Sequence, residues 1–310
     1  MRKAFIDQLT CLAEVDRRIV LLTADLGFGV VEGFAAAHPD RFFNVGVAEQ
    51  NMVGVATGLA SAGLIPFVYS ISTFAVLRPY EFLRNGPVLH QLQVRVVGTG
   101  AGVEYGHNGT THFALEDVAV LRALPGIDIV APADSAQAVN ALRCTWDQPG
   151  PVYFRLGKNE DVVVPGLDGR FDESGIASLV GPPEGDVLVL ALGTSALAAL
   201  EGRDRVLAVD PSASVSVAVV SRIHAASFLY LADVLARFRR IVVVEAHNRN
   251  GGLGSLVAEV ACEHGLGLSL TRLSADRFPA RTGSQSFLEG QLGIDADAVA
   301  RAVAAQTAMA

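Results

Sequence analysis

The sequence predicts an α/β fold built from two doubly wound domains. Short runs rich in Val, Ile and other strand formers alternate with helical patterns, which is the order that a parallel sheet with helices on both faces requires. Hydrophobic residues make up 51% of the 310 residues and charged residues 18%, which suits sheets covered on both faces or a large subunit interface. A stretch rich in Gly, Pro and Asp interrupts the pattern. We therefore expect a first domain over 1–160, a linker over 161–185 and a second domain over 186–310.

The first domain begins with a helical pattern near 3–16 and continues in alternating strands and helices. We expect strands at 19–25, 42–47, 65–71, 94–100, 127–134 and 152–156. We expect further helices near 49–62, 74–91, 115–123 and 135–148. The run FFNVGV at 42–47 is typical of a short buried strand. Asp134 or Ser135 can cap the helix that follows the fifth strand.

The second domain repeats the alternation after the linker. We expect strands at 186–193, 215–223, 240–247 and 268–273, with helices near 195–208, 229–239 and 252–265. The run GGLG at 251–254 lies between a strand and a helix, where it either binds an anion or simply makes a tight turn. We favour the tight turn. The chain has neither a P-loop motif nor a complete dinucleotide-binding fingerprint.

Charge and cysteine usage exclude several classes of protein. The net charge is −8 and no run is rich in Lys or Arg, so nucleic acid and anionic membranes are poor partners. Cys11, Cys144 and Cys262 are far apart in sequence, and no metal-ligand spacing is present around them or around the histidines. The apolar runs have the length of strands, not of membrane spans. We expect a reduced cytoplasmic protein without a metal site of its own.

Glu49 is the first residue that points to chemistry. It is a lone acid between an apolar strand and a helix of small residues, and burying a carboxylate is costly unless it is paired or protonated. The following segment brings Phe74 and Tyr80, with Arg78 and Arg84 close by. A buried acid beside an aromatic wall can hold a flat nitrogen heterocycle by one hydrogen bond and by stacking. An acid in the first turn of a helix is also commonly a structural cap.

A second group of polar residues follows the fourth expected strand. The segment GTGAGVEYGHNGTTHFALED at 98–117 gathers Gly, Asn, Thr and two His beyond the end of a strand, where open α/β sheets bind substrates. We favour a substrate role for His112. Arg155 ends the last strand of the first domain and either binds a phosphate or carboxylate or serves the structure. Arg2 on its own is typical of a solvated terminal charge.

The amino-acid sequences of several segments resemble those of the transketolases. VGVAEQNMVGVATGLASAG, PFVYSISTF, GTTHFALEDVAVLRALPGIDIVAPAD and VYFRLGKNE are similar, in this order, to their pyrimidine-binding domain. VLVLALGTSALAALE and IVVVEAHNRNGGLGSLVAEV are similar to the transketolase C-terminal domain. The resemblance spans nearly the whole chain. It implies a pyrimidine-binding domain followed by a C-terminal domain, both of the doubly wound α/β type.

The resemblance implies thiamin diphosphate as the cofactor. It places Glu49 at N1′ of the aminopyrimidine, where a carboxyl group favours the tautomer that activates the cofactor for attack on a ketose carbonyl. Phe74 corresponds to the aromatic residue that stacks on the pyrimidine. Tyr80 falls on a second aromatic position of the pocket. Leu77 stands where the family has another aromatic residue, so the pocket is expected to be altered.

The resemblance also implies a substrate site. His112 matches the family histidine near the reacting carbonyl, and Arg155 and Arg2 match phosphate-binding arginines. Gly100 stands in place of a substrate histidine and Asn108 in place of an aspartate that contacts a sugar hydroxyl. The serine that joins the phosphate site corresponds to Gly29. These departures leave the donor, the acceptor and the preference for phosphate open.

The resemblance finally implies a partner subunit. Full-length transketolases carry a further N-terminal domain with a Gly-Asp-Gly motif that holds Mg²⁺ or another divalent cation and the diphosphate, and this sequence has no such motif. We therefore expect a split enzyme of α2β2 composition that acts on sugar phosphates. The alternatives are the β subunit of a 2-oxo acid dehydrogenase, a ketol transferase that passes its unit to a carrier-bound thiol, and an inert regulatory subunit. A 1-deoxyxylulose-5-phosphate synthase is disfavoured because that enzyme is usually one long chain.

Overall fold

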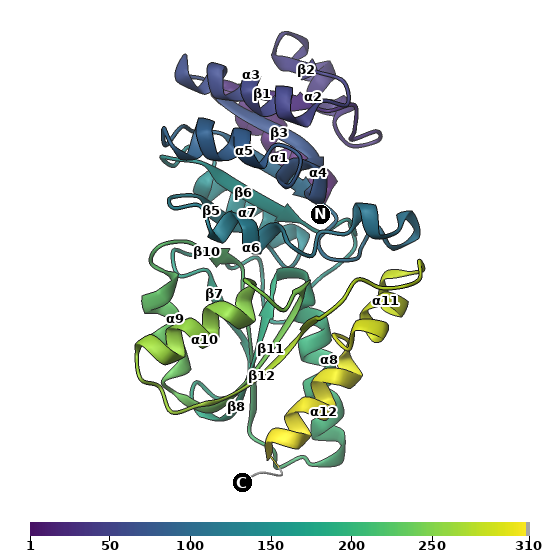
Figure 1. Cartoon of the computed structure of the whole chain (residues 1–310), viewed down its shortest axis with the longest axis vertical. Coiled ribbons are helices and arrows are strands. Elements are labelled where there is room, and N and C mark those ends of the chain that lie inside the picture. The colour runs from purple at the N-terminus through teal and green to yellow at the C-terminus, as the bar shows by residue number, and fades with distance from the viewer. Residues whose placement is uncertain (308–310) are drawn as a thin grey trace.

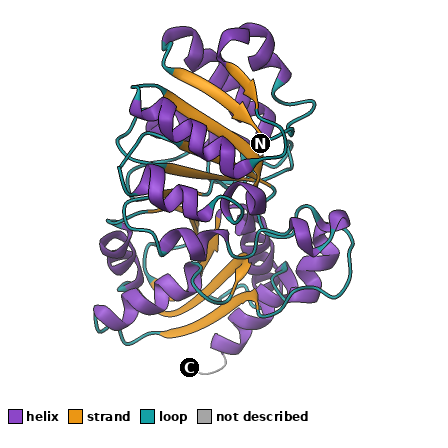
Figure 2. Cartoon of the chain, turned by 45° about the horizontal axis from the view of Figure 1, so that its top comes forward, coloured by secondary structure: helices purple, strands orange, loops and turns teal. Residues whose placement is uncertain are grey.

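Two sheets, one above the other in Figure 1, organise the chain. A computed structural model describes residues 1–307. The first sheet has seven strands in the order β10-β5-β6-β4-β3-β1-β2, and the second has five in the order β12-β11-β8-β9-β7. Helices cover both faces of each sheet (Figure 2). This arrangement confirms the predicted α/β fold class.

The first sheet is parallel except at one edge. Its parallel strands are β1 (Ile19–Thr23), β2 (Phe42–Asn44), β3 (Ile65–Ile71), β4 (Arg95–Thr99), β5 (Asp128–Val130) and β6 (Val152–Leu156). Helices α1 (Arg2–Val15), α2 (Glu32–Ala37) and α7 (Ser135–Thr145) pack on one face. The other face carries α3 (Glu49–Ser61), α4 (Ser72–Val76), α5 (Tyr80–Leu83) and α6 (Asp117–Arg122). Asp134 caps α7 by accepting a hydrogen bond from the Gln137 amide at 2.8 Å, as its position in the sequence allowed.

The second sheet has one antiparallel edge strand. It contains β7 (Ile176–Val180), β8 (Gly185–Leu192), β9 (Val215–Val220), β11 (Phe238–Asn248) and β12 (Ser269–Ala275). Its helices are α8 (Ala196–Val209), α9 (Ser227–Leu235), α10 (Leu253–Glu263), α11 (Gln285–Leu292) and α12 (Ala296–Thr307). Helices α2, α11 and α12 and strand β7 lie outside the elements expected from the sequence. Strand β7 lies within the expected linker 161–185.

Two expected elements differ from their sequence patterns. The expected helix at 74–91 is broken into α4, α5 and a π-helical turn over Arg84–Val88, because Pro79 and Pro87 remove backbone donors and interrupt a regular helix. The expected buried strand at 42–47 is the short edge strand β2, and Phe43 is exposed there. An edge strand has a neighbour on one side only, so apolar composition alone did not decide its burial.

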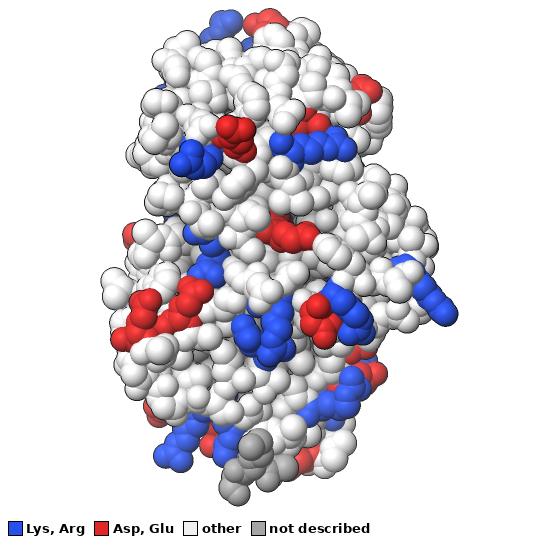
Figure 3. Space-filling view, viewed as in Figure 1, with Lys and Arg blue, Asp and Glu red and all other residues white. Residues whose placement is uncertain are grey.

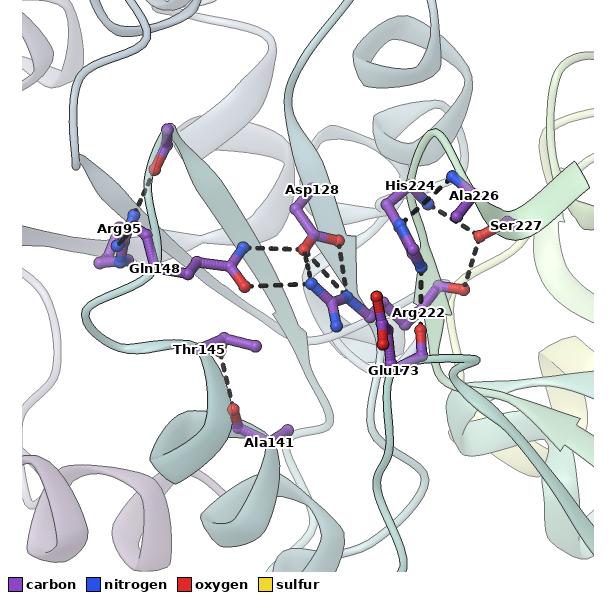
Figure 4. A network of polar contacts seen from close by, with 11 residues as sticks. Arg95, Asp128, Ala141, Thr145, Gln148, Glu173, Arg222, His224, Ala226 and Ser227 are labelled. Carbon is purple, nitrogen blue, oxygen red and sulfur yellow. Dashed lines mark hydrogen bonds and ion pairs between the residues drawn. The ribbon is translucent and has the colours of Figure 1, made fainter. Parts of the chain in front are cut away.

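The two domains share one contact surface through β10 (Arg222–Ile223), which comes from the second half of the chain and pairs antiparallel with β5 of the first sheet. Figure 4 shows the side chains that accompany this pairing. The Arg222 guanidinium donates to the Asp128 carboxylate at 2.6 and 2.9 Å and to the Gln148 side-chain oxygen at 3.0 Å. The backbone amide of Asn248 donates to Leu115 O at 2.7 Å and so adds a second tie between the domains. The carboxyl end of the first sheet is therefore held against the second domain.

Within residues 1–307, no helix is both long and apolar enough to cross a membrane.

Candidate active site

The residues that sequence analysis selected gather at the carboxyl ends of the central strands of the first sheet. Parallel strands place their carboxyl ends at one edge, and β3, β4 and β6 are neighbours in this sheet. Phe74 follows β3, His112 lies in the loop after β4, and α3 begins with Glu49 just after β2. The fold thus brings these three residues from separate segments into one region.

Glu49 is buried and paired. Its residue is 3% exposed at the first position of α3. The Arg78 Nη1 donates to Glu49 Oε1 at 2.8 Å, and the Ser70 hydroxyl lies 3.4 Å from the same oxygen. The Arg78 side chain itself is 44% exposed. Arg78 therefore spans from solvent to the buried carboxylate.

Phe74 carries the second contact of Arg78. The Arg78 guanidinium carbon lies 3.8 Å from the centroid of the Phe74 ring, a cation–π contact. The His112 ring meets the Phe74 ring edge-on, with centroids 5.0 Å apart and an interplanar angle of 65°. One planar guanidinium thus covers the aromatic face and hydrogen-bonds the buried acid at the same time.

His112 is a half-buried imidazole in a partly positive environment. Burial, and secondarily the charge of Arg78, lower the pKa of His112 from its ordinary value. Its Nδ1 lies 3.0 Å from the Thr111 hydroxyl. The neutral ring is therefore favoured at pH 7. When the Thr111 hydroxyl donates to Nδ1, the ring proton is on Nε2, which can then donate to a substrate oxygen.

Tyr80 and Leu77 lie further along the same segment. The Tyr80 hydroxyl donates to Val120 O at 2.9 Å, which directs the ring toward α6. Leu77 is 39% exposed and precedes Arg78 at the end of α4. Neither residue has a described contact with Glu49, so their place in a cofactor pocket stays a prediction.

Arg155 does not lie where a phosphate could reach it. The residue is 1% exposed, and its Nε donates to Asp117 Oδ2 at 2.7 Å. Its Nη2 donates to Ala114 O at 2.9 Å and to Ala246 O, in the second domain, at 3.0 Å. The structure does not support the expected phosphate-binding role, because these donors are used inside the chain. Arg155 instead joins the two domains.

A different pair of cations lies near the mouth of the site. Arg2 Nε donates to Lys158 O at 3.2 Å. The Lys158 Nζ lies 4.8 Å from the centroid of the Tyr105 ring, and Tyr105 in turn neighbours His112 at 6.3 Å between centroids. Sequence analysis missed Lys158 and Tyr105. The signal for Lys158 was its position two residues past the end of β6, at the edge where the other site residues gather.

The three substitutions noted in the resemblance lie in loops. Gly100 has φ +81° directly after β4, and Asn108 is exposed in the loop that carries His112. Gly29 has φ +77° in the loop after β1, and its amide donates to Glu32 Oε1 at 2.8 Å. Glycine adopts a positive φ at little cost, which explains in part why residues 29 and 100 are glycines.

The glycine-rich turn at 251–254 binds an acid of the chain itself. The amides of Leu253 and Gly254, at the start of α10, donate to the two carboxylate oxygens of Glu245 at 2.7 and 3.0 Å. A Cβ atom on Gly252 would overlap this carboxylate. Burial raises the pKa of Glu245 to about 7. This geometry agrees with the tight turn expected from the sequence, because the amides at the start of α10 are already bound to the Glu245 carboxylate.

No group of three or more His, Cys, Asp or Glu side chains among the described residues is placed to hold a metal ion.

Known proteins resemble this chain over its whole length. The family model for the transketolase pyrimidine-binding domain matches residues 1–161. A putative transketolase C-terminal section of Methanocaldococcus jannaschii is 33% identical over 307 residues, which cover 98% of this chain and 95% of the relative. The 6-deoxy-6-sulfo-D-fructose transketolase subunit of Clostridium sp. is 34% identical over 307 residues, covering 97% and 92%. A solved split-gene transketolase, in an inactive β4 tetramer, aligns with a TM-score of 0.86 at 32% identity and covers 99% of this chain and 97% of its own.

Proposed function

The chain belongs to the transketolase family, and on this premise we propose that it is the pyrimidine-binding, C-terminal-type subunit of a split transketolase. The proposed enzyme transfers a two-carbon ketol unit from a ketose, preferably a ketose phosphate, to an acceptor. Its cofactor is thiamin diphosphate. The observation that carries the proposal is that one guanidinium, that of Arg78, both hydrogen-bonds the buried Glu49 and lies on the Phe74 ring, which His112 meets edge-on.

The contacts of Arg78 indicate that the site formed by Glu49 and Phe74 suits an aminopyrimidine. The guanidinium is a planar, nitrogen-bearing group that donates to Glu49 and lies on Phe74. An aminopyrimidine offers the same two features, a flat face and a nitrogen edge, so the donor set fits it. We propose that Glu49 holds or shares a proton at N1′ of the ring. The side chain of Arg78 must move away for the ring to enter.

The cofactor, when bound, supplies the carbon nucleophile that accepts the ketol unit. The residues of this chain bind and orient around it. We propose that Phe74 stacks on the pyrimidine and that the neutral His112 donates to the oxygen of the reacting carbonyl. Arg2 and Lys158 form the cationic end of the substrate site, in place of the buried Arg155. Gly100 and Asn108 stand where the family has a substrate histidine and an aspartate that contacts a sugar hydroxyl. We propose that these two positions distinguish the donor and acceptor sugars of this enzyme from those of other family members.

A partner subunit is proposed to hold the diphosphate and its divalent cation. Helix α3 begins with Glu49 and leaves Gly54, Val55 and Gly58 exposed, with Phe82 of α5 beside Gly54. Small residues allow close packing of a neighbouring chain, and exposed apolar side chains gain from being covered. The area over α3 is largely uncharged, whereas acidic and basic side chains gather around α5 below it (Figures 1 and 3). This face is our proposed interface in an α2β2 assembly.

Reconstitution is the direct test of the proposed function. We expect the chain alone to be inactive. We expect it to transfer ketol units from a ketose phosphate once it is mixed with the Gly-Asp-Gly subunit from the same organism, thiamin diphosphate and Mg²⁺. The measurement is a coupled assay of ketol transfer alongside the mass of the complex. A complex that decarboxylates pyruvate and leaves ketose phosphates untouched would show a 2-oxo acid dehydrogenase subunit instead, and a stable but inactive complex would show a regulatory one.

Removing the Arg78 guanidinium should separate cofactor binding from stability. In Arg78→Met the buried Glu49 loses its partner, so the chain without cofactor should unfold more easily. Because nothing then has to be displaced, the cofactor should bind about fivefold more tightly, the equivalent of roughly 1 kcal/mol for a partly exposed contact. Thermal unfolding of the chain and titration of the complex with thiamin diphosphate measure the two effects. Arg84→Met, in the exposed turn after α5, is the matched control and should change neither.

A further inference from the structure

The Tyr105 ring packs against Gly100 beside the proposed substrate site. Gly100 has a left-handed backbone directly after β4. A Cβ atom at residue 100 would overlap the Tyr105 ring. The Tyr105 ring therefore fills the space that a side chain at residue 100 would need. A glycine at one position makes room for the tyrosine at the other.

Tyr105 lies between the two ends of the proposed substrate site. Its ring centroid is 6.3 Å from that of His112, with an interplanar angle of 47°. The Lys158 Nζ lies 4.8 Å from the centroid of the same ring, within the range of a cation–π contact. The Tyr105 hydroxyl lies 3.4 Å from the Thr99 hydroxyl, which anchors the ring against the end of β4. The same ring is thus a neighbour of both His112 and the ammonium group of Lys158.

The same loop also holds the backbone of Lys158. The Lys158 amide donates to the Glu104 carboxylate, next to Tyr105 in sequence. Its carbonyl accepts the hydrogen bond from Arg2 described above. Lys158 is therefore fixed at its amide, its carbonyl and its ammonium group. Of these three contacts, only the one with Tyr105 directs the charged end of the side chain.

We infer that Tyr105 is a positioning residue that determines specificity for ketoses with an anionic terminus. It sets where the Lys158 charge lies relative to His112, and so how far the anionic group of a substrate lies from the carbonyl that reacts. This inference rests on the proposed function. A ketose without an anionic group offers no charge for Lys158 to bind, so its affinity should depend little on residue 105.

The test measures binding in the reconstituted complex that carries Glu49→Gln, in which turnover is blocked, with D-fructose 6-phosphate and D-fructose as calorimetric probes. Tyr105→Ala should weaken D-fructose 6-phosphate binding about fivefold, the size of a cation–π contact in a partly exposed site. D-fructose binding should not change. Tyr105→Phe keeps the ring and should bind both probes as the parent complex does, which separates a specific loss from misfolding.

A double-variant comparison shows whether Tyr105 acts through Lys158. Lys158→Met should weaken D-fructose 6-phosphate binding, and adding Tyr105→Ala to it should cause no further loss. Equal losses for both probes in Tyr105→Ala, additive losses in the double variant, or absent binding of D-fructose 6-phosphate would each overturn the inference. Failure of the proposed function is distinguishable, because it appears as absent ketol transfer in the complex with Glu49 and Tyr105 intact.

Discussion

Replacing Glu49 by Gln is expected to lower the rate of ketol transfer by about a thousandfold, within the range that positioned acid–base groups contribute. Glutamine has the shape of glutamate and keeps an oxygen for Arg78 and Ser70. An amide cannot share a proton with the N1′ atom of an aminopyrimidine as a carboxyl group does. The loss should therefore fall on activation of the cofactor and leave the fold unchanged.

The measurement is the initial rate of ketol transfer by the reconstituted complex at saturating thiamin diphosphate, with thermal unfolding of the same variant as the check on folding. Asp297→Asn is the matched control, since Asp297 lies in the first turn of α12 as Glu49 does in that of α3, but is exposed and belongs to the second domain. The control should retain full activity. Wild-type rates in Glu49→Gln would contradict the role proposed for Glu49 and leave the family assignment in place.

Sequence periodicity was enough to predict most strands and helices of both domains, but not α2, β7, α11 or α12. Buried parallel strands such as β3 and β8 are largely apolar runs, the pattern that strands covered on both faces show. The pattern failed where a second influence decides the structure. Pro79 and Pro87 broke a helix whose hydrophobic spacing was correct, and β2 became half-exposed because it lies at an edge. Strand β10 has only two residues, and its pairing with β5 depends on how the domains dock, which local sequence does not encode.

The site was predictable where residue type and position agree. Glu49, Phe74 and His112 each follow a strand of the first sheet, so topology alone brings them to one edge. The arginines were less predictable because a guanidinium serves equally in ion pairs within the protein and in anion sites. Arg155 lies near the end of β6 but is buried, with Ala246 of the second domain among its acceptors, and Arg78 directly contacts Glu49 and Phe74, which it was only expected to neighbour. Contacts between domains and side-chain packing decided both cases.

Replacing Asp117 by Asn is expected to lower the free energy of unfolding by about 3–5 kcal/mol, the usual cost of breaking a buried ion pair from one side. Asp117 begins α6 and is fully buried. Its Oδ2 accepts from Arg155 Nε and from the Tyr153 hydroxyl, each at 2.7 Å. Burial is the largest single effect and opposes ionisation of this carboxyl, but the charge of Arg155, the neighbouring His247 and the hydrogen bonds from Arg155 and Tyr153 together outweigh it and hold the pKa of Asp117 below its usual range. Removing the negative charge leaves the enclosed guanidinium without a counter-charge.

The loss of stability in Asp117→Asn should extend to the domain interface, because Arg155 contacts both domains. Its guanidinium also donates to Ala246 O in β11, so the pair supports the docking of the second domain on the edge where Glu49 and His112 lie. Urea unfolding of the isolated chain measures the effect, and Asp7→Asn is the control, because Asp7 pairs with Lys3 on the surface, where solvent screens the pair and its loss should change stability little.

The double variant Asp117→Asn/Arg155→Met decides between a buried ion pair and simple packing. With both charges removed, no uncompensated charge remains, so the double variant should be more stable than Asp117→Asn alone. Equal or greater destabilisation in the double variant would mean that the Arg155 contacts with Ala114 and Ala246 stabilise the domain interface independently of Asp117. A loss in Asp117→Asn no larger than in the surface control would contradict the structural role assigned to the pair.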